Sequence, residues 1–255
     1  MNNGVFLLLA AAINMFVTGI FATVVLKQYL RRRRSYQLYW SIALSMAFLA
    51  TLAYIGMILV YPTSAAGVVL FRSYYALGGA VMPAWLGLGS IALVSKKRGA
   101  DICFMVLSVL SVLAVLLVFL ARVDMGKLHM IVGTPGTGIL EPGAWLIMVI
   151  VLNTAGVVAV AGVALYSGWK LLRRQKSLAG GRTSNIVWAN IFIFVGAILN
   201  GAAGSLARFL EIQNIFWLIM AAGWIVLFVG VVLASRRSQS AKQTATSETK
   251  QTASA

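Results

Sequence analysis

Residues 5–34 read VFLLLAAAINMFVTGIFATVVLKQYLRRRR, a long apolar run that ends in a cluster of basic side chains. The apolar part, Val5–Leu26, is long enough to cross a bilayer, because a transmembrane helix needs about 20 apolar residues. The basic part, Lys27 with Arg31–Arg34, is typical of a loop that stays in the cytoplasm. In a secretory signal, basic residues precede the apolar run, but none precedes this one. The stretch therefore predicts an uncleaved first helix with its N-terminus outside.

The same arrangement recurs along the chain. Seven apolar runs predict spans at about Val5–Leu26, Leu38–Val60, Tyr74–Val94, Ile102–Ala121, Ala144–Tyr166, Ile186–Leu206 and Ile215–Ala234. Basic clusters follow the first, third, fifth and seventh runs, and the last three clusters are Lys96–Arg98, Lys170–Lys176 and Arg236–Arg237. If odd-numbered spans run from outside to inside, 17 of the 21 Lys and Arg residues lie inside, and those outside are Arg72, Arg122, Lys127 and Arg208. We therefore expect an all-α, polytopic protein of the bacterial cytoplasmic membrane with a cytoplasmic C-terminus.

The composition fits a chain embedded in lipid. Of 255 residues, 61% are hydrophobic and 10% are charged, whereas a typical soluble protein has about 25% charged residues. The net charge of +16 does not indicate nucleic-acid binding, because no basic domain lies outside the spans. We expect the basic loops to contact the bilayer, in particular anionic lipids at the cytoplasmic face. The single cysteine, Cys103, excludes an intrachain disulfide and a cysteine metal cage.

Two segments lie outside the seven spans. The loop 122–143 is the longest outer connection, and its Gly133–Gly138 centre is rich in the turn-forming residues Gly and Pro. We expect a small hairpin that lies across the outer mouth of the bundle. Residues 238–255 consist mainly of Ser, Thr, Gln, Ala and Lys, which bury too little apolar surface to fold. The chain thus divides into a transmembrane domain, 1–237, and a disordered cytoplasmic tail.

An internal repeat is visible when the sequence is shifted on itself by about 139 residues. Asn14 then falls on Asn153, and Trp85 falls on Trp224. The shift predicts two three-helix halves, residues 4–98 and 143–237, that have the same orientation and are joined by the fourth span. Parallel repeats of this kind occur in transporters. Chance similarity between apolar helices is the alternative.

Asparagine in the middle of a span needs a hydrogen-bonding partner, because lipid offers none. Asn14 and Asn153 occupy such positions in the first and fifth spans. One interpretation places them as a symmetric pair that lines a central ligand site. The other interpretation is that each amide joins two helices, a bond that contributes about 0.6 kcal/mol on average in membranes.

Two arginines lie near the outer ends of the spans, Arg72 in the third and Arg208 in the sixth. Together with Tyr74 and Tyr75 they form a candidate site for an anionic or polar ligand that arrives from outside. The alternative is that both arginines extend outward to the lipid head groups. Glu211 lies one turn from Arg208 and is a candidate ion-pair partner for it.

Catalytic and cofactor-binding patterns do not occur. No span carries Asp, Glu, Lys or His near its centre, although proton pumps and ion-coupled carriers use such groups. The one histidine, His129, excludes bis-histidine haem, and no metalloprotease, serine hydrolase or phosphate-loop motif is present. We therefore expect no enzyme activity and no cofactor.

The stretch 72–90, RSYYALGGAVMPAWLGLGS, is similar to a segment of uncharacterised bacterial seven-helix membrane proteins. Its tyrosines followed by Pro83 and Trp85 also resemble the third helix of the seven-helix sensor domain that precedes some bacterial histidine kinases. The resemblance implies a sensory membrane domain. The arrangement of two three-helix halves around a linking span is similar to that of the sugar-transporting SWEET proteins, and implies transport of a small solute.

These observations lead to two functional expectations. The first is a non-enzymatic receptor-like or accessory protein that acts through a protein partner or as a homo-oligomer, since the chain carries no kinase or cyclase domain. The second is a transporter of a small solute or lipid, built from the two halves. A transporter needs a continuous polar path through the bundle, whereas a receptor needs only an outer pocket.

Overall fold

The computed structural model describes residues 3–175, 184–210 and 215–252. Over these residues the chain is helical, apart from turns and one isolated β-bridge. In these described ranges, seven helical segments are long and apolar enough to cross a membrane. The expectation of an all-α membrane protein with seven spans is therefore confirmed.

The helices follow the predicted spans closely. They are α1 (Asn3–Arg32), α2 (Ser35–Leu59), α3 (Ala65–Tyr74), the π-helix η1 (Tyr75–Val81), α4 (Met82–Val94), α5 (Lys97–Leu120), α6 (Met125–His129), α7 (Ala144–Gln175), α8 (Ser184–Phe209) and α9 (Phe216–Thr252). The third span begins at Ala65 rather than at Tyr74, because the Ser64 hydroxyl caps the helix by accepting a hydrogen bond from the Gly67 amide at 3.0 Å.

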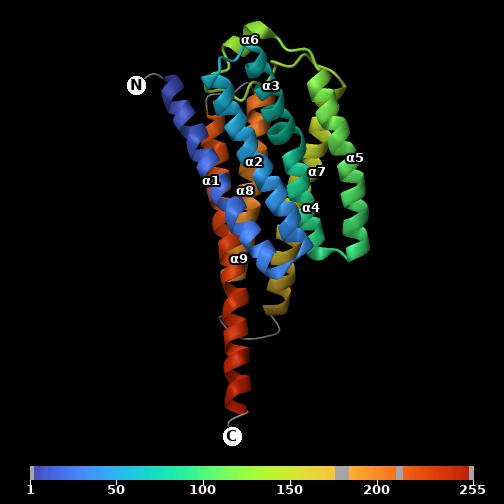
Figure 1. Cartoon of the computed structure of the whole chain (residues 1–255). Helices are drawn as coiled ribbons and strands as arrows, with labels where there is room; N and C mark the ends of the chain where they lie inside the picture. The colour runs from blue at the N-terminus through green and yellow to red at the C-terminus, as the bar shows by residue number, and fades with distance from the viewer. Residues whose placement is uncertain (1–2, 176–183, 211–214, 253–255) are drawn as a thin grey trace.

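The last helix continues past the membrane. α9 extends through residues 238–252, whereas the sequence predicts a disordered tail there. Ala, Gln, Lys and Glu in this segment are good helix formers, so a helix that has started in the span can propagate along them without any tertiary contact. Figure 1 shows this continuation extending away from the bundle.

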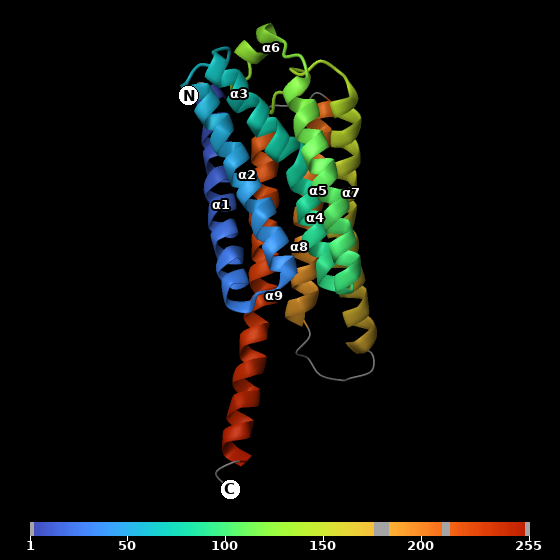
Figure 2. The same ribbon diagram turned by 45° about the vertical axis from the view of Figure 1, so that its right-hand side comes forward.

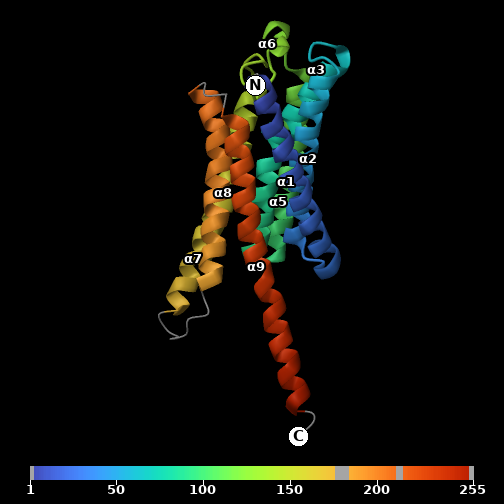
Figure 3. The same cartoon turned by 90° about the vertical axis from the view of Figure 1, so that its left-hand side faces the viewer.

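Six of the transmembrane segments close into a ring. Going around the ring, α1 packs on α2, α2 on α4, α4 on α7, α7 on α8, α8 on α9, and α9 on α1. The remaining long helix, α5, lies outside the ring against η1, α4 and α7. Figures 2 and 3 show the bundle from two further sides. The ring surrounds the central space in which the candidate site lies.

The two ends of the bundle differ in character. The α1–α2 turn with Arg33 and Arg34, the α4–α5 turn with Lys96, and the extended part of α9 all lie at one end, and the N-terminus and α6 lie at the other (Figure 1). Arg33 adopts a left-handed backbone conformation with φ of 51°, which tightens the α1–α2 turn. Lys176 and Arg182 of the third basic cluster and its loop lie outside the described residues.

Small residues bring the helices of the ring close together. A Cβ atom on Gly156 of α7 would lie 2.2 Å from the Pro83 carbonyl oxygen, and one on Gly87 of α4 would lie 2.9 Å from the Gly156 Cα. A Cβ on Gly196 of α8 would lie 2.7 Å from the backbone nitrogen of Leu227 in α9. Only glycine allows such backbone contact, which is the usual basis of tight helix packing in lipid.

Candidate functional site

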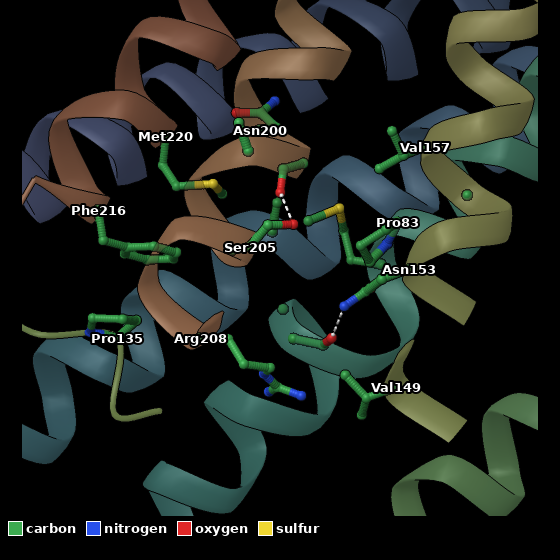
Figure 4. A pocket seen from close by; sticks show the side chains of 18 of the residues that line it. Pro83, Pro135, Val149, Asn153, Val157, Asn200, Ser205, Arg208, Phe216 and Met220 are labelled. Carbon is green, nitrogen blue, oxygen red and sulfur yellow. Dashed lines mark hydrogen bonds between the residues drawn. The ribbon is translucent and has the colours of Figure 1, made fainter. Parts of the chain in front are cut away.

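A cavity of about 520 Å³ occupies the ring, between the centre of the bundle and the α6 end. Its volume lies within the range of about 300–1,000 Å³ that is common for small-molecule sites. Figure 4 shows the side chains of α7, α8 and α9 that point into it. Five of the six residues that the sequence indicated line this cavity, namely Asn14, Tyr74, Tyr75, Asn153 and Arg208.

The cavity wall in the third span owes its shape to Pro83. Proline has no N–H, so the carbonyl of Gly79, four residues earlier, loses its ordinary α-helical partner. The chain widens into η1 just before Pro83, as π-helical turns often do at functional sites. Asn153 of α7 donates from Nδ2 to the Gly79 carbonyl at 2.8 Å (Figure 4). Asn153 therefore joins α7 to the third span, as the second interpretation of this residue required.

The two predicted asparagines each leave an acceptor free. Asn14 is 2% exposed, and its Nδ2 donates to the Thr51 hydroxyl on α2 at 2.9 Å. Within the part of the chain that the structure describes, the Oδ1 atoms of Asn14 and Asn153 are buried and have no hydrogen-bond partner. The amide nitrogens thus join helices, as the second interpretation required, and both residues line the cavity.

Arg208 supplies the positive charge of the site. Its Nη2 donates to the Tyr75 hydroxyl, and its guanidinium lies 6.0 Å from the Tyr75 ring centroid and 5.7 Å from that of Trp145. Its Nη1 is buried without a hydrogen-bond partner among the described residues. No described carboxylate forms an ion pair with it, and Glu211 lies outside the described residues. Figure 4 shows the side chain reaching across the cavity toward Val149 and Asn153.

The loop 122–143 forms a roof over the cavity. Residues Val123 and Leu140 pair as an antiparallel bridge, and the Asp124 amide donates to the Ile139 carbonyl at 2.9 Å, so the predicted hairpin is confirmed. Asp124 caps α6 by accepting from the Lys127 amide, and this hydrogen bond holds the pKa of the Asp124 carboxyl below its usual value.

Buried hydrogen bonds fix this roof to the helices. The Tyr74 hydroxyl donates to the Pro135 carbonyl at 3.1 Å, and the Thr137 hydroxyl donates to the Ala207 carbonyl at 3.1 Å. The Tyr54 hydroxyl accepts from the Gly133 amide at 2.9 Å. Pro135 and Thr137 also line the cavity, so the hairpin forms one wall of the site.

Aromatic side chains of α1 and α9 pack together on the basic side of the cavity. The rings of Phe21 in α1 and Phe228 in α9 lie 5.0 Å apart, and the Trp224 ring lies 6.4 Å from that of Phe21. Phe21 and Trp224 are each 1% exposed. The residues that line the site extend from Pro135 and Thr137 of the hairpin to Trp224 near the middle of the last span.

Arg72 does not belong to the pocket, contrary to its place in the predicted site. Its guanidinium donates to the carbonyl of Phe119 and, at 3.0 Å, to that of Ala121. These carbonyls end α5, where the last four have no partner within the helix. Arg72 therefore ties α3 to α5, and it neither faces the cavity nor extends to lipid head groups.

Several cavity residues were not predicted as part of the site. They are Pro83, Asn200, Trp217 and Trp224, together with Pro135 and Thr137 of the hairpin. Asn200 carries the same sequence signal as Asn14 and Asn153, because a polar amide in the middle of an apolar run needs a partner. Both of its side-chain polar atoms are buried without a hydrogen-bond partner in the described chain. The tryptophans carry no such signal, since aromatic residues are common throughout the spans.

Neither a protein-family model nor a curated protein matches this chain. The functional argument accordingly depends on the geometry of the cavity.

Proposed function

We propose that the protein is a non-enzymatic, receptor-like membrane protein that binds a small ligand with an anionic group in the central cavity and acts through a protein partner. The observation that carries the proposal is the Arg208 guanidinium. It is a cation held against two aromatic rings in a cavity of ligand size, with one buried nitrogen left without a hydrogen-bond acceptor. A carboxylate or phosphate group of a ligand would supply that acceptor and neutralise the charge.

The shape of the cavity supports a receptor more than a channel or a carrier. The hairpin 122–143 covers the cavity on one side, and the rings of Phe21, Trp224 and Phe228 pack together on the other. The free Oδ1 atoms of Asn14 and Asn153 add acceptors for a hydroxyl or N–H group of the ligand. Such a pocket suits recognition of an occupant, because it offers a few fixed polar groups among apolar walls.

The orientation in the membrane is part of the proposal. Basic residues gather at the end of the bundle opposite the hairpin, where they would contact anionic lipids of the inner leaflet of the cytoplasmic membrane. The cavity then lies in the outer half of the membrane beneath the hairpin, so it is placed to sense a ligand from outside. The partner would contact the cytoplasmic end.

Transport of a small solute or lipid is the second candidate, and the order of helices in the ring favours it. If residues 143–237 repeat residues 4–98, then α7, α8 and α9 are the counterparts of α1, α2 and α4. The contacts α1–α2, α2–α4 and α4–α7 then have the counterparts α7–α8, α8–α9 and α9–α1, all of which are present. α5 lies outside the ring, as a linking helix would. These relations support a parallel repeat, which is a common plan of transporters.

The test of the proposed function is a binding measurement on Arg208→Gln in lipid nanodiscs. The probes are small organic anions and their uncharged analogues, and the control is Arg122→Gln, which removes the same charge from an exposed position outside the cavity. A charge-assisted hydrogen bond contributes about 1.5–3 kcal/mol, so we expect Arg208→Gln to weaken binding of an anionic ligand by about tenfold to a hundredfold. Arg122→Gln should bind as the original protein does.

Equal affinities of the original protein and the Arg208→Gln variant for every bound anion would contradict the proposal. Movement of a bound solute across a sealed vesicle would instead favour the transporter. The protein partner can be sought by extracting the protein without detergent. The proteins that co-purify with it are then identified with and without ligand.

A further inference from the structure

The cavity wall is closed on one side of the ring and exposed on the other. The lining residues that α1, α2 and the third span contribute are largely buried, as Asn14, Tyr74 and Tyr75 illustrate. The lining residues of α7 and α8 include exposed side chains, such as Val158 at 63% and Phe209 at 68%. Cavity walls that are exposed on two neighbouring helices indicate an opening between those helices.

Two glycines of α8 locate this opening. A Cβ atom on Gly201 would touch the Val157 side chain of α7 at 3.1 Å, so the helices are in contact at that level. A Cβ on Gly204, one turn nearer the hairpin, would meet no atom within 4 Å. Gly204 and its neighbour Ser205 are exposed and line the cavity. We interpret the open space beside Gly204 as a gap between the two helices, one turn along α8 from Arg208.

This gap faces the hydrocarbon of the bilayer, because it lies in the side of a bundle whose helices span the membrane. A molecule that enters through it must already be dissolved in the leaflet. Arg208 lies near the end of α8, at the level where that helix leaves the membrane, whereas the deeper walls include apolar residues such as Val157 and Met220. An amphiphile can therefore keep its charged group at the interface while its chain slides sideways into the cavity, which avoids the cost of carrying a charge through hydrocarbon.

We propose that the ligand is a single-chain amphiphile with an anionic head, and that it enters the cavity from the outer leaflet through the gap between α7 and α8. This rests on the ligand-binding function proposed above. The cavity of about 520 Å³ suits one acyl chain, since drug-sized ligands fill sites of about 300–1,000 Å³. The head is a carboxylate or a phosphate monoester, both of which match the planar donor face of Arg208.

The first experiment measures the chemistry of the ligand. The full chain in phosphatidylcholine nanodiscs is titrated at pH 8 with dodecanoate, dodecyl phosphate, dodecanol and dodecyltrimethylammonium, which share one chain length. We expect saturable binding of at least one anionic probe, about tenfold or more tighter than that of dodecanol. The stronger of the two anions distinguishes a fatty acid from a lysophospholipid-like head. Equal binding of dodecanol, or tighter binding of the cationic probe, would overturn the assignment.

The second experiment tests the route with Gly204→Trp, which places a large side chain in the gap without a steric clash at Cβ. The matched control is Gly162→Trp on α7, where a Cβ also meets no atom within 4 Å but the residue does not line the cavity. We expect Gly204→Trp to slow association and dissociation of the anionic probe together, by about tenfold, while Gly162→Trp leaves both rates unchanged.

The two proposals fail in different ways. If the probe binds saturably and depends on Arg208, but Gly204→Trp leaves the association rate unchanged, the lateral route is wrong and the pocket stands. If Gly204→Trp only accelerates dissociation, the tryptophan occupies the pocket, and the route is wrong as well. If no anionic probe binds saturably, the ligand class proposed here is wrong, whereas binding of other, non-amphiphilic anions that depends on Arg208 would leave the proposed function intact.

Discussion

At the scale of single residues, the polar groups in the spans divide into those that hold helices together and those that face the cavity. Asn153 does both, because its nitrogen satisfies the Gly79 carbonyl and its oxygen is free. Arg72 and Arg208 have similar places near the ends of their spans that lie toward the hairpin, yet one caps α5 and the other lines the cavity. Residue type and depth alone did not separate the two arginines, because the separation depends on which helix lies beside each.

Substitution of Asn153 tests its link to Pro83. Asn153→Leu removes the donor to the Gly79 carbonyl, and we expect it to lower the free energy of unfolding by about 0.6–1.7 kcal/mol, the range measured for such bonds in membranes. In the Pro83→Ala background, residue 83 regains its N–H and can donate to the Gly79 carbonyl itself. Asn153→Leu should then lower the free energy of unfolding by less. Equilibrium unfolding in mixed micelles measures both, and Asn14→Leu, whose partner is Thr51, should show no coupling to Pro83→Ala.

Substitution of Arg72 separates stability from binding. Arg72→Gln removes the charged donor that serves the last carbonyls of α5, and we expect a loss of about 1.5–3 kcal/mol in the free energy of unfolding. Affinity for an anionic probe should stay unchanged, because Arg72 does not line the cavity. A loss of affinity with unchanged stability would show that the predicted outer site was right after all.

At the scale of helices, packing depends on glycine where two backbones approach. α4 and α7 cross at Gly87 and Gly156, and this crossing holds the Pro83 region and Asn153 in contact. The position of this cavity wall thus depends on the crossing of α4 and α7, which is too close to admit even one methyl group.

Gly156→Ala should therefore destabilise the bundle. The added Cβ would lie 2.2 Å from the Pro83 carbonyl oxygen, a backbone atom that cannot move aside without shifting α4. Overpacking of this kind costs about 1–3 kcal/mol, and the thermal midpoint of the purified protein measures it. Gly162→Ala on the same helix is the control, because its Cβ meets no neighbour. Equal midpoints for the two variants would argue against the close crossing.

At the scale of the whole molecule, charge and shape are arranged along one axis. The basic turns lie at one end, the hairpin lies at the other, and the pocket lies between the hairpin and the aromatic cluster of Phe21, Trp224 and Phe228. This axis determines which leaflet the proposed ligand comes from.

Reporter fusions test the orientation directly. A reporter that is active only in the cytoplasm should give a signal when it is fused after Arg237. A reporter that is active only outside should give a signal when it is inserted at Gly136 in the hairpin. The reason is that Lys- and Arg-rich loops resist translocation, and 17 of the 21 basic residues lie on the side assigned to the cytoplasm. An external signal after Arg237 would reverse the assignment of the ligand to the outer leaflet.

Much of the architecture was predictable from the sequence because its causes are local. Twenty apolar residues in a row predict a span wherever they occur, and the Gly- and Pro-rich centre of residues 122–143 predicts a turn. Residues 238–252 show where local composition is ambiguous. Their composition predicts disorder, but Ala, Gln and Lys are also good helix formers, and α9 continues along them.

The sequence by itself determined seven spans, their alternating basic connections and five of the residues that line the pocket. Those properties depend on hydrophobicity, charge and the need of a polar group in lipid to find a partner. Only the tertiary structure decided that the helices form a ring with α5 outside, that Arg208 and not Arg72 lines the cavity, and that Gly204 of α8 lies open beside it. These features depend on which helices become neighbours, and apolar helices of similar composition carry no local signal of their neighbours.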